Sequence, residues 1–103
     1  MDEAKALANR GLFQEAATLC REYLRNHLPH AGIYCLLGLI HEASGHVTEA
    51  EECYMKALYL DPDHYESLIQ TSLLYQQKGN AEQAALFRRR AGQREGGTDG
   101  HNR

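Results

Sequence analysis

The feature that most constrains this chain is a glycine-containing segment that recurs every 34 residues. The three copies read RGLFQEA from Arg10, SGHVTEA from Ser44 and KGNAEQA from Lys78. Their glycines are Gly11, Gly45 and Gly79, and the alanines that follow keep the same interval, at Ala16, Ala50 and Ala84. A repeat of this length is one supersecondary unit that stacks on its neighbours, because a single unit cannot bury its apolar face alone.

The pattern inside the repeat predicts an all-α protein, since apolar residues recur at helical spacing and no window alternates as a strand would. We expect six helices, over residues 2–9, 13–26, 31–43, 47–60, 65–77 and 81–94. Short connections make consecutive helices antiparallel neighbours. The sequence thus predicts one domain over residues 1–95, with units at 1–30, 31–64 and 65–95 and a truncated first unit. The polar residues 96–103 are expected to be disordered.

Local signals mark the ends of several of these helices. Gly45 and Gly79 suit the left-handed conformation that terminates a helix. Asn80 and Asp63 each precede a Gln or Glu by three residues, which is the spacing of a capping box at a helix N-terminus. Pro62 has no N–H group to donate, so the helix over 47–60 is expected to stop before it.

The helix over residues 31–43, AGIYCLLGLIHEA, is apolar around almost its whole circumference. A helix of this kind is packed on all sides, so we expect it in the middle of the stack. The first and last helices have polar faces, and the last carries Arg88, Arg89 and Arg90. Polar terminal units keep a stacked array soluble.

Small residues recur where the two helices of a unit are expected to cross. Ala4, Gly38 and Ser72 are 34 residues apart, and Ala16, Ala50 and Ala84 recur likewise on the facing helices. Small side chains let the two backbones approach, while Tyr23 and Tyr54 supply neighbouring bulk. We therefore expect close helix crossings at these positions.

These residues resemble the tetratricopeptide repeat pattern W-x2-L-G-x2-Y, A-x3-F and a closing proline. The middle unit carries the matching residues Tyr34, Leu37, Gly38, Ala50, Tyr54, Ala57 and Pro62, and departs from the pattern at His41. The resemblance implies a right-handed superhelical stack of antiparallel helix pairs. It also implies an interaction module, because the first helices of such units line a concave binding face.

A closer resemblance extends from about Leu7 to Arg90, and includes the run LGLIHEASGHVTEAEECYMKALYLDPDHYESL. This run is similar to the repeat segment at the C-terminal end of bacterial chemoreceptor methyltransferases of the CheR type. The resemblance implies that this chain is a non-catalytic, regulatory or targeting segment of an enzyme that transfers methyl groups from S-adenosylmethionine to receptor glutamates. It implies no cofactor for the segment itself, since nothing here resembles a nucleotide-binding fingerprint.

On the family's register, one groove is the candidate binding site. Its predicted residues are Cys35, Leu36, Leu39, Glu42, Ala43, Ile69, Gln70, Leu73, Gln76 and Gln77, with Lys5, Ala8, Asn9 and Glu66 on the same face. An apolar centre with polar rims suits a protein or peptide partner. The resemblance points to a chemoreceptor, another signalling component or the enzyme's own catalytic domain. Several of these side chains could instead pack only between helices.

Two alternatives within the interaction class stay open. The chain could be a stand-alone adaptor unrelated to methyl transfer, or a module that self-associates weakly through Leu86 and Phe87 on the last helix. The carboxylate clamp of some tetratricopeptide proteins is not expected. Its positions hold Met1, Lys5, Leu36, Glu66 and Gln70, and only one of these is basic.

Other classes of function find little support in the sequence. The net charge of −3 gives no general attraction for nucleic acid, and consecutive arginines at 88–90 point in different directions around a helix. The pairs His41 with His46 and His27 with His30 lack a third metal ligand at a suitable spacing. Glu49 to Glu52 read as a solvated helix face, not a catalytic pair.

The cellular setting is predicted from composition. The three cysteines show no CxxC spacing, so reduced and buried thiols are expected. No apolar run approaches the roughly 20 residues of a membrane span, and the first residues, MDEAKALANR, do not read as a secretory signal. We therefore expect a cytoplasmic protein without membrane insertion.

Overall fold

The computed structural model describes the backbone of residues 2–100 and the side chains of residues 2–93. This part of the chain forms six helices and no strand. They are α1 (Asp2–Asn9), α2 (Phe13–Asn26), α3 (Ala31–Ala43), α4 (Val47–Leu60), α5 (Tyr65–Gln77) and α6 (Ala81–Gly100). The all-α prediction is confirmed, and the first five helices have the expected limits.

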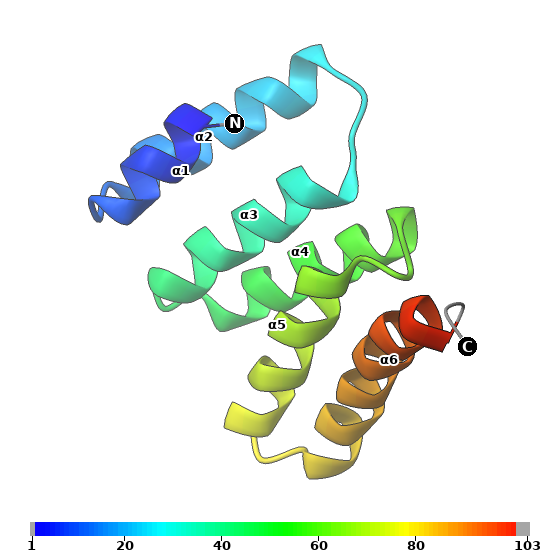
Figure 1. Cartoon of the computed structure of the whole chain (residues 1–103). Helices are drawn as coiled ribbons and strands as arrows, with labels where there is room; N and C mark the ends of the chain where they lie inside the picture. The colour runs from blue at the N-terminus through cyan, green and yellow to red at the C-terminus, as the bar shows by residue number, and fades with distance from the viewer. Residues whose placement is uncertain (1, 101–103) are drawn as a thin grey trace.

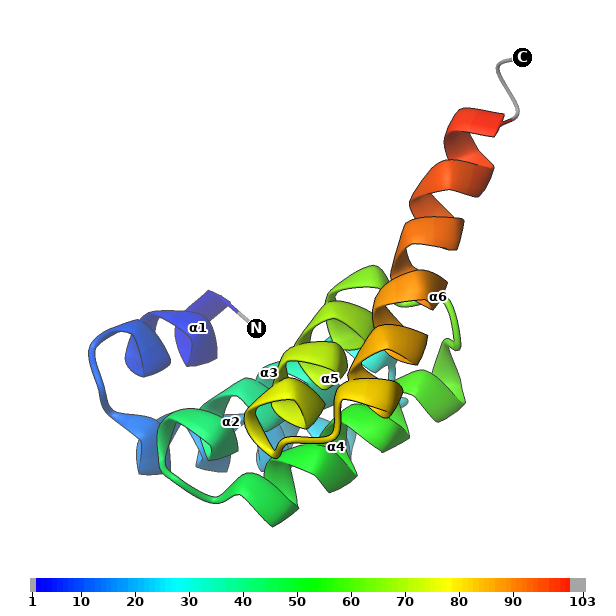
Figure 2. The same cartoon turned by 90° about the horizontal axis from the view of Figure 1, so that it is seen from below.

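The helices form a curved stack of antiparallel pairs (Figures 1 and 2). The most extensive packing joins α3 to α4 and α5 to α6, and α1 pairs with α2. Figure 2 shows α1, α3 and α5 on the inner side of the curve and α2 and α4 on its outer side. At 8 residues, α1 is shorter than the 13-residue α3 and α5, as expected of a truncated first unit. The placement of the unit boundaries stays a prediction.

The end of α6 differs from the expectation. The sequence predicts an end near residue 94 and a disordered segment over 96–103, whereas α6 continues to Gly100. Figure 2 shows its last turns extending beyond the other helices. A helix can grow past its packed part because each added residue gains a hydrogen bond without a new nucleation step. Residues 101–103 lie outside the described part of the chain.

Three equivalent corners give the stack its regular geometry. Gly11, Gly45 and Gly79 have φ angles of 80°, 84° and 81°, in the left-handed region. At each corner, the glycine N–H donates to the carbonyl three residues back, and the next N–H donates to the carbonyl five residues back. The distances after α3 are 3.1 Å from Gly45 N to Glu42 O and 2.8 Å from His46 N to His41 O. These two hydrogen bonds at each corner satisfy carbonyl groups that the end of the helix would otherwise leave unpaired.

Histidines cap two of the inner helices, which the sequence did not predict. The Nδ1 atom of His30 accepts from Ile33 N at 3.4 Å, and that of His64 accepts from Ser67 N at 3.3 Å. The expected cap at Asp63 is therefore wrong by one residue, since α5 begins after His64. At α6 the expected cap is confirmed, because Asn80 Oδ1 accepts from the Gln83 N–H at 3.2 Å.

The core follows the predicted close crossings. The small residues Ala4, Gly38, Ser72, Ala16, Ala50 and Ala84 are all buried. At the central crossing, a Cβ atom on Gly38 would lie 2.5 Å from Cε1 of Tyr54, so only glycine fits against this ring. As expected, α3 is buried on most sides, and it contacts α2, α4 and α5. The three core clusters share helices, so the units are joined into one body.

Candidate functional site

The inner face of the curve holds a pocket of about 440 Å³ between α1, α2, α3 and α5. It is lined by Lys5, Ala8, Asn9, Phe13, Leu36, Leu39, Ile40, Ala43 and Glu66. The structure thus brings together seven residues that the sequence placed on this face. It adds Phe13 and Ile40, which the groove prediction missed.

Phe13 escaped prediction because it belongs to α2, whereas the register assigns the groove to the first helix of each unit. Phe13 is the first residue of α2, directly after the Gly11 corner. Its half-buried ring packs against the first core cluster. At this corner the start of α2 lines the inner-face pocket together with Asn9 and Ala43. A large aromatic residue beside a turn was the available signal, since Val47 and Ala81 occupy the equivalent positions.

Cys35 does not line the groove. It is only 1% exposed and packs in the second core cluster with Tyr54 and Leu74. Burial raises the pKa of its thiol to about 11, although a hydrogen bond with Ser67 acts in the opposite direction. This thiol is a packing residue and stays protonated at neutral pH. Its inclusion among the groove residues is corrected on this ground.

Glu42 is half-buried and held by the core instead of being free for a ligand. Its Oε1 atom accepts a hydrogen bond from the Tyr54 hydroxyl at 2.7 Å. Burial of Tyr54, followed by this bond to Glu42, raises the pKa of the tyrosine well above its ordinary value. Glu42 therefore fixes the ring that fills the Gly38 crossing, next to the groove.

The predicted residues on α5 lie outside the pocket and continue the inner face. Leu73 is 43% exposed, and Gln77 is also exposed. Ile69 and Gln70 are half-buried. Gln76 accepts a hydrogen bond from Arg88 Nη2 at 3.1 Å, so it links α5 to α6. The face therefore has one pocket near α3 and a more open surface along α5.

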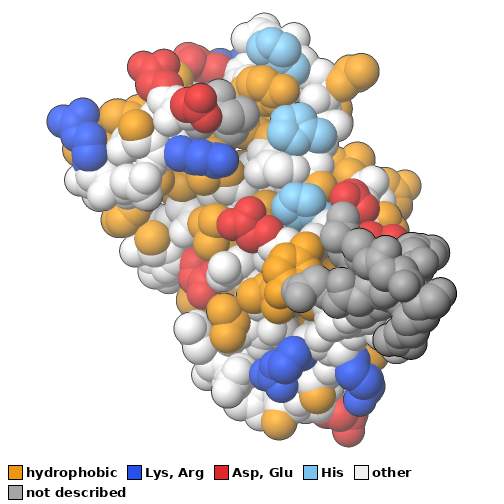
Figure 3. Space-filling model, viewed as in Figure 1, with side chains coloured by type: hydrophobic (Ala, Val, Ile, Leu, Met, Phe, Trp, Pro, Cys, Tyr) orange, Lys and Arg blue, Asp and Glu red, His pale blue; other side chains and the backbone are white. Residues whose placement is uncertain are grey.

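The chemistry of this face is that of recognition. Leu36, Leu39 and Phe13 give the pocket an apolar part, while Lys5 and Glu66 place opposite charges at its edge. Figure 3 shows acidic, basic and apolar side chains interspersed over this side of the molecule. Such a surface can take an apolar side chain of a partner and pair with charges on either side of it.

Within the described residues, no group of three His, Cys, Asp or Glu side chains is arranged to hold a metal ion. Arg88 binds Gln76, and Arg90 Nη2 donates to the carbonyl of Pro62 at 3.1 Å. None of the helices in this part of the chain is long and apolar enough to span a lipid bilayer.

Residues 31–64 match the family model described as tetratricopeptide repeat. This unit is a tetratricopeptide repeat, and the described chain has the fold of a stack of such units. The match covers the unit that carries Gly38, Ala50 and Tyr54, whose close crossing is described above. A solved structure, "Crystal structure of MamA", superposes with a TM-score of 0.86 over 93% of this chain and 56% of that one. At 22% identity this likeness concerns the fold alone.

Among curated proteins, the chain is similar to two methyltransferases. It is 36% identical over 85 residues to "Probable biofilm formation methyltransferase WspC" of Pseudomonas putida. It is 36% identical over 90 residues to the protein of the same name in Pseudomonas aeruginosa. These matches cover 82% and 87% of this chain, but the chain spans only 20% and 21% of the two proteins. The expected likeness to a methyltransferase repeat segment is confirmed.

Proposed function

We propose that this repeat array is a protein-interaction module, and that it serves as the regulatory or targeting segment of a chemotaxis-type protein-glutamate O-methyltransferase. The observation that carries the proposal is the pocket of about 440 Å³ on the inner face, with its apolar part and its oppositely charged edge. Similarity to the WspC methyltransferases over most of the chain supports the link to methyl transfer. Methyl transfer itself would be performed by a separate catalytic domain. An enzyme that modifies the signalling part of chemoreceptors would act in the cytoplasm.

The partner is proposed to be a helical or extended protein segment that inserts an apolar side chain between Leu36 and Leu39. Its neighbouring residues would carry an acidic group toward Lys5 and a basic group toward Glu66, since both charges are exposed. A chemoreceptor signalling segment and the enzyme's own catalytic domain are the two candidates. Binding to the receptor would keep the enzyme close to its target glutamates, whereas binding to the catalytic domain would regulate the enzyme.

The test measures binding of each candidate to the array by isothermal titration calorimetry. Leu39→Asp places a charge in the pocket and is expected to weaken binding about tenfold or more, because apolar anchors dominate such interfaces. Leu28→Asp is the matched control, since Leu28 is 88% exposed in the turn after α2 and lies outside the pocket. Circular dichroism should show the same helix content in both variants.

Two results would count against this proposal. Equal binding by Leu39→Asp and wild type would place the interaction elsewhere on the molecule. If neither candidate binds the wild-type array, its proposed role in methyl transfer is wrong, and a stand-alone adaptor is favoured.

A further inference from the structure

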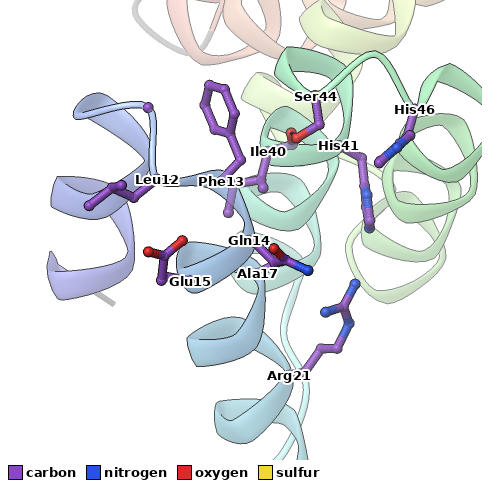
Figure 4. A pocket seen from close by; sticks show the side chains of 11 residues that line it. Leu12, Phe13, Gln14, Glu15, Ala17, Arg21, Ile40, His41, Ser44 and His46 are labelled. Atoms are coloured by element: carbon purple, nitrogen blue, oxygen red, sulfur yellow. Dashed lines mark hydrogen bonds between the residues drawn. The ribbon is translucent and has the colours of Figure 1, made fainter.

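A second pocket, of about 520 Å³, lies between the first two units, where the corners after α1 and α3 come together (Figure 4). It is formed by the start of α2, the end of α3 and the turn before α4. Phe13 and Ile40 separate it from the inner-face pocket, because both line the two cavities. This pocket plays no part in the proposed function.

Three basic side chains converge on one side of the second pocket. Arg21 comes from α2, His41 from α3 and His46 from the turn before α4. The His41 and His46 rings have centroids 5.9 Å apart. Figure 4 shows the Arg21 guanidinium pointing toward the His41 ring, with the His46 ring turned toward His41. The site therefore offers one permanent cation and two groups that become cations on protonation.

This cluster lacks a matched counter-charge. Among the described residues, no carboxylate forms an ion pair with Arg21. The acidic groups around the pocket are Glu15, which Figure 4 shows on the far side from Arg21, and Glu49 on α4. Burial, followed by the charge of Arg21, lowers the pKa of His41, and Glu49 opposes this only in part. An anion placed among the three side chains would relieve this repulsion.

The side of the pocket away from Arg21 carries apolar side chains together with the Glu15 carboxylate. Leu12, Phe13 and Ile40 line it, and Figure 4 shows them across the cavity from Arg21. The volume exceeds what a bare inorganic anion occupies. The polarity of the walls therefore favours a ligand with an anionic head and an apolar body.

We propose that this pocket binds a phosphomonoester through Arg21, His41 and His46, with the organic group of the ligand against Leu12, Phe13 and Ile40. Hydrogen-bond donors that approach from α2, α3 and the turn before α4 suit a phosphate better than a planar carboxylate, because the phosphate oxygens point in three directions. His41 is also the residue at which the middle unit departs from the tetratricopeptide pattern. The general repeat pattern therefore supplies no such imidazole.

The proposal has a defined pH dependence. The cations and acids that face the site are Arg21, His41, His46, Glu15 and Glu49. A bound phosphate stabilises the imidazolium forms, so the complex takes up protons as it forms. Affinity for the dianionic phosphate should therefore rise as pH falls from about 8, until the phosphate itself takes up a proton at about pH 6.

The experiment follows the imidazole C–H signals of the full chain by NMR while phenyl phosphate is added. Shifts confined to His41 and His46, with saturation near about 1 mM, are expected. Inorganic phosphate should bind more weakly because it lacks the organic group. The same titration is repeated with a phosphoserine peptide. Tighter binding of the peptide than of phenyl phosphate would identify a modified protein as the source, and weaker binding would identify a small molecule.

Two substitutions test the contacts directly. Arg21→Gln and His46→Gln change exposed side chains, and each should weaken phenyl phosphate binding about tenfold. Arg25→Gln is the matched control, since this exposed arginine is one turn further along α2 and does not line the pocket. Absence of shifts up to about 10 mM ligand would overturn the proposal. So would unchanged binding by Arg21→Gln, or shifts centred on His27 and His30.

Discussion

At the residue scale, the contact between Gly38 and Tyr54 is the tightest constraint on sequence. Gly38→Ala would place a methyl group 2.5 Å from the Tyr54 ring, which is held by its bond to Glu42. We expect the free energy of unfolding to fall by about 1–3 kcal/mol, measured by urea denaturation. Gly92→Ala is the control, because nothing lies within 4 Å of a Cβ at this helical position. That variant should instead gain about 0.5–1 kcal/mol, and equal losses in both would contradict the crossing.

Thr71 gives a second prediction at the residue scale. Its hydroxyl is a buried side-chain oxygen without a hydrogen-bond partner among the described residues, and the residue is 1% exposed. Thr71→Val keeps the shape and removes the unsatisfied group, so stability should rise by about 1 kcal/mol. Thermal unfolding of the two proteins measures this. A loss of stability would mean that the hydroxyl is satisfied, for example by water.

At the element scale, a polar network ties α4 to α5. Glu51 accepts hydrogen bonds from Lys78 Nζ at 2.6 Å and from the Tyr75 hydroxyl at 2.7 Å. The Tyr75 ring also stacks on Phe87 of α6, at 5.7 Å between centroids. Phe87 is only 8% exposed, so of the two residues predicted for self-association, Leu86 alone is exposed. This network connects the central unit to the last one.

The network predicts how stability depends on acid. Hydrogen bonds from Lys78 and then Tyr75 lower the pKa of Glu51 in the folded state. The unfolded state therefore binds the proton more readily, and the stabilisation is present above the ordinary glutamate pKa of about 4.3. It should be lost as pH falls through the lower, folded pKa. Denaturation of wild type and Glu51→Gln from about pH 6 to about pH 3 should give curves that converge at the acid end. A constant difference in stability between the two proteins over this pH range would contradict the role assigned to Glu51.

At the scale of the whole molecule, the stack should unfold unevenly. In α1 only Ala4 is buried, whereas α3 has seven buried residues and neighbours on several sides. Stability in such arrays is a sum over units and their interfaces, so a terminal helix opens at lower free energy than a central one. Hydrogen exchange followed by mass spectrometry should show faster exchange in α1 than in α3. Equal protection of the two helices would contradict a stacked array.

The sequence alone determined the architecture of this protein. The 34-residue spacing of Gly11, Gly45 and Gly79 predicted the corners, and the small residues at each crossing predicted which faces pack. These features are local: a left-handed glycine or an apolar helix face acts on its own unit and its immediate neighbour. The limits of α1 to α5 were predictable for the same reason.

Only the tertiary structure decided which side chains meet between units. It buried Cys35, brought Phe13 and Ile40 to the groove, moved the α5 cap to His64 and gathered Arg21, His41 and His46 around one pocket. These outcomes depend on how far each unit turns relative to the last. That rotation results from the packing of all side chains at the interface, so a repeat pattern read along one unit does not contain it.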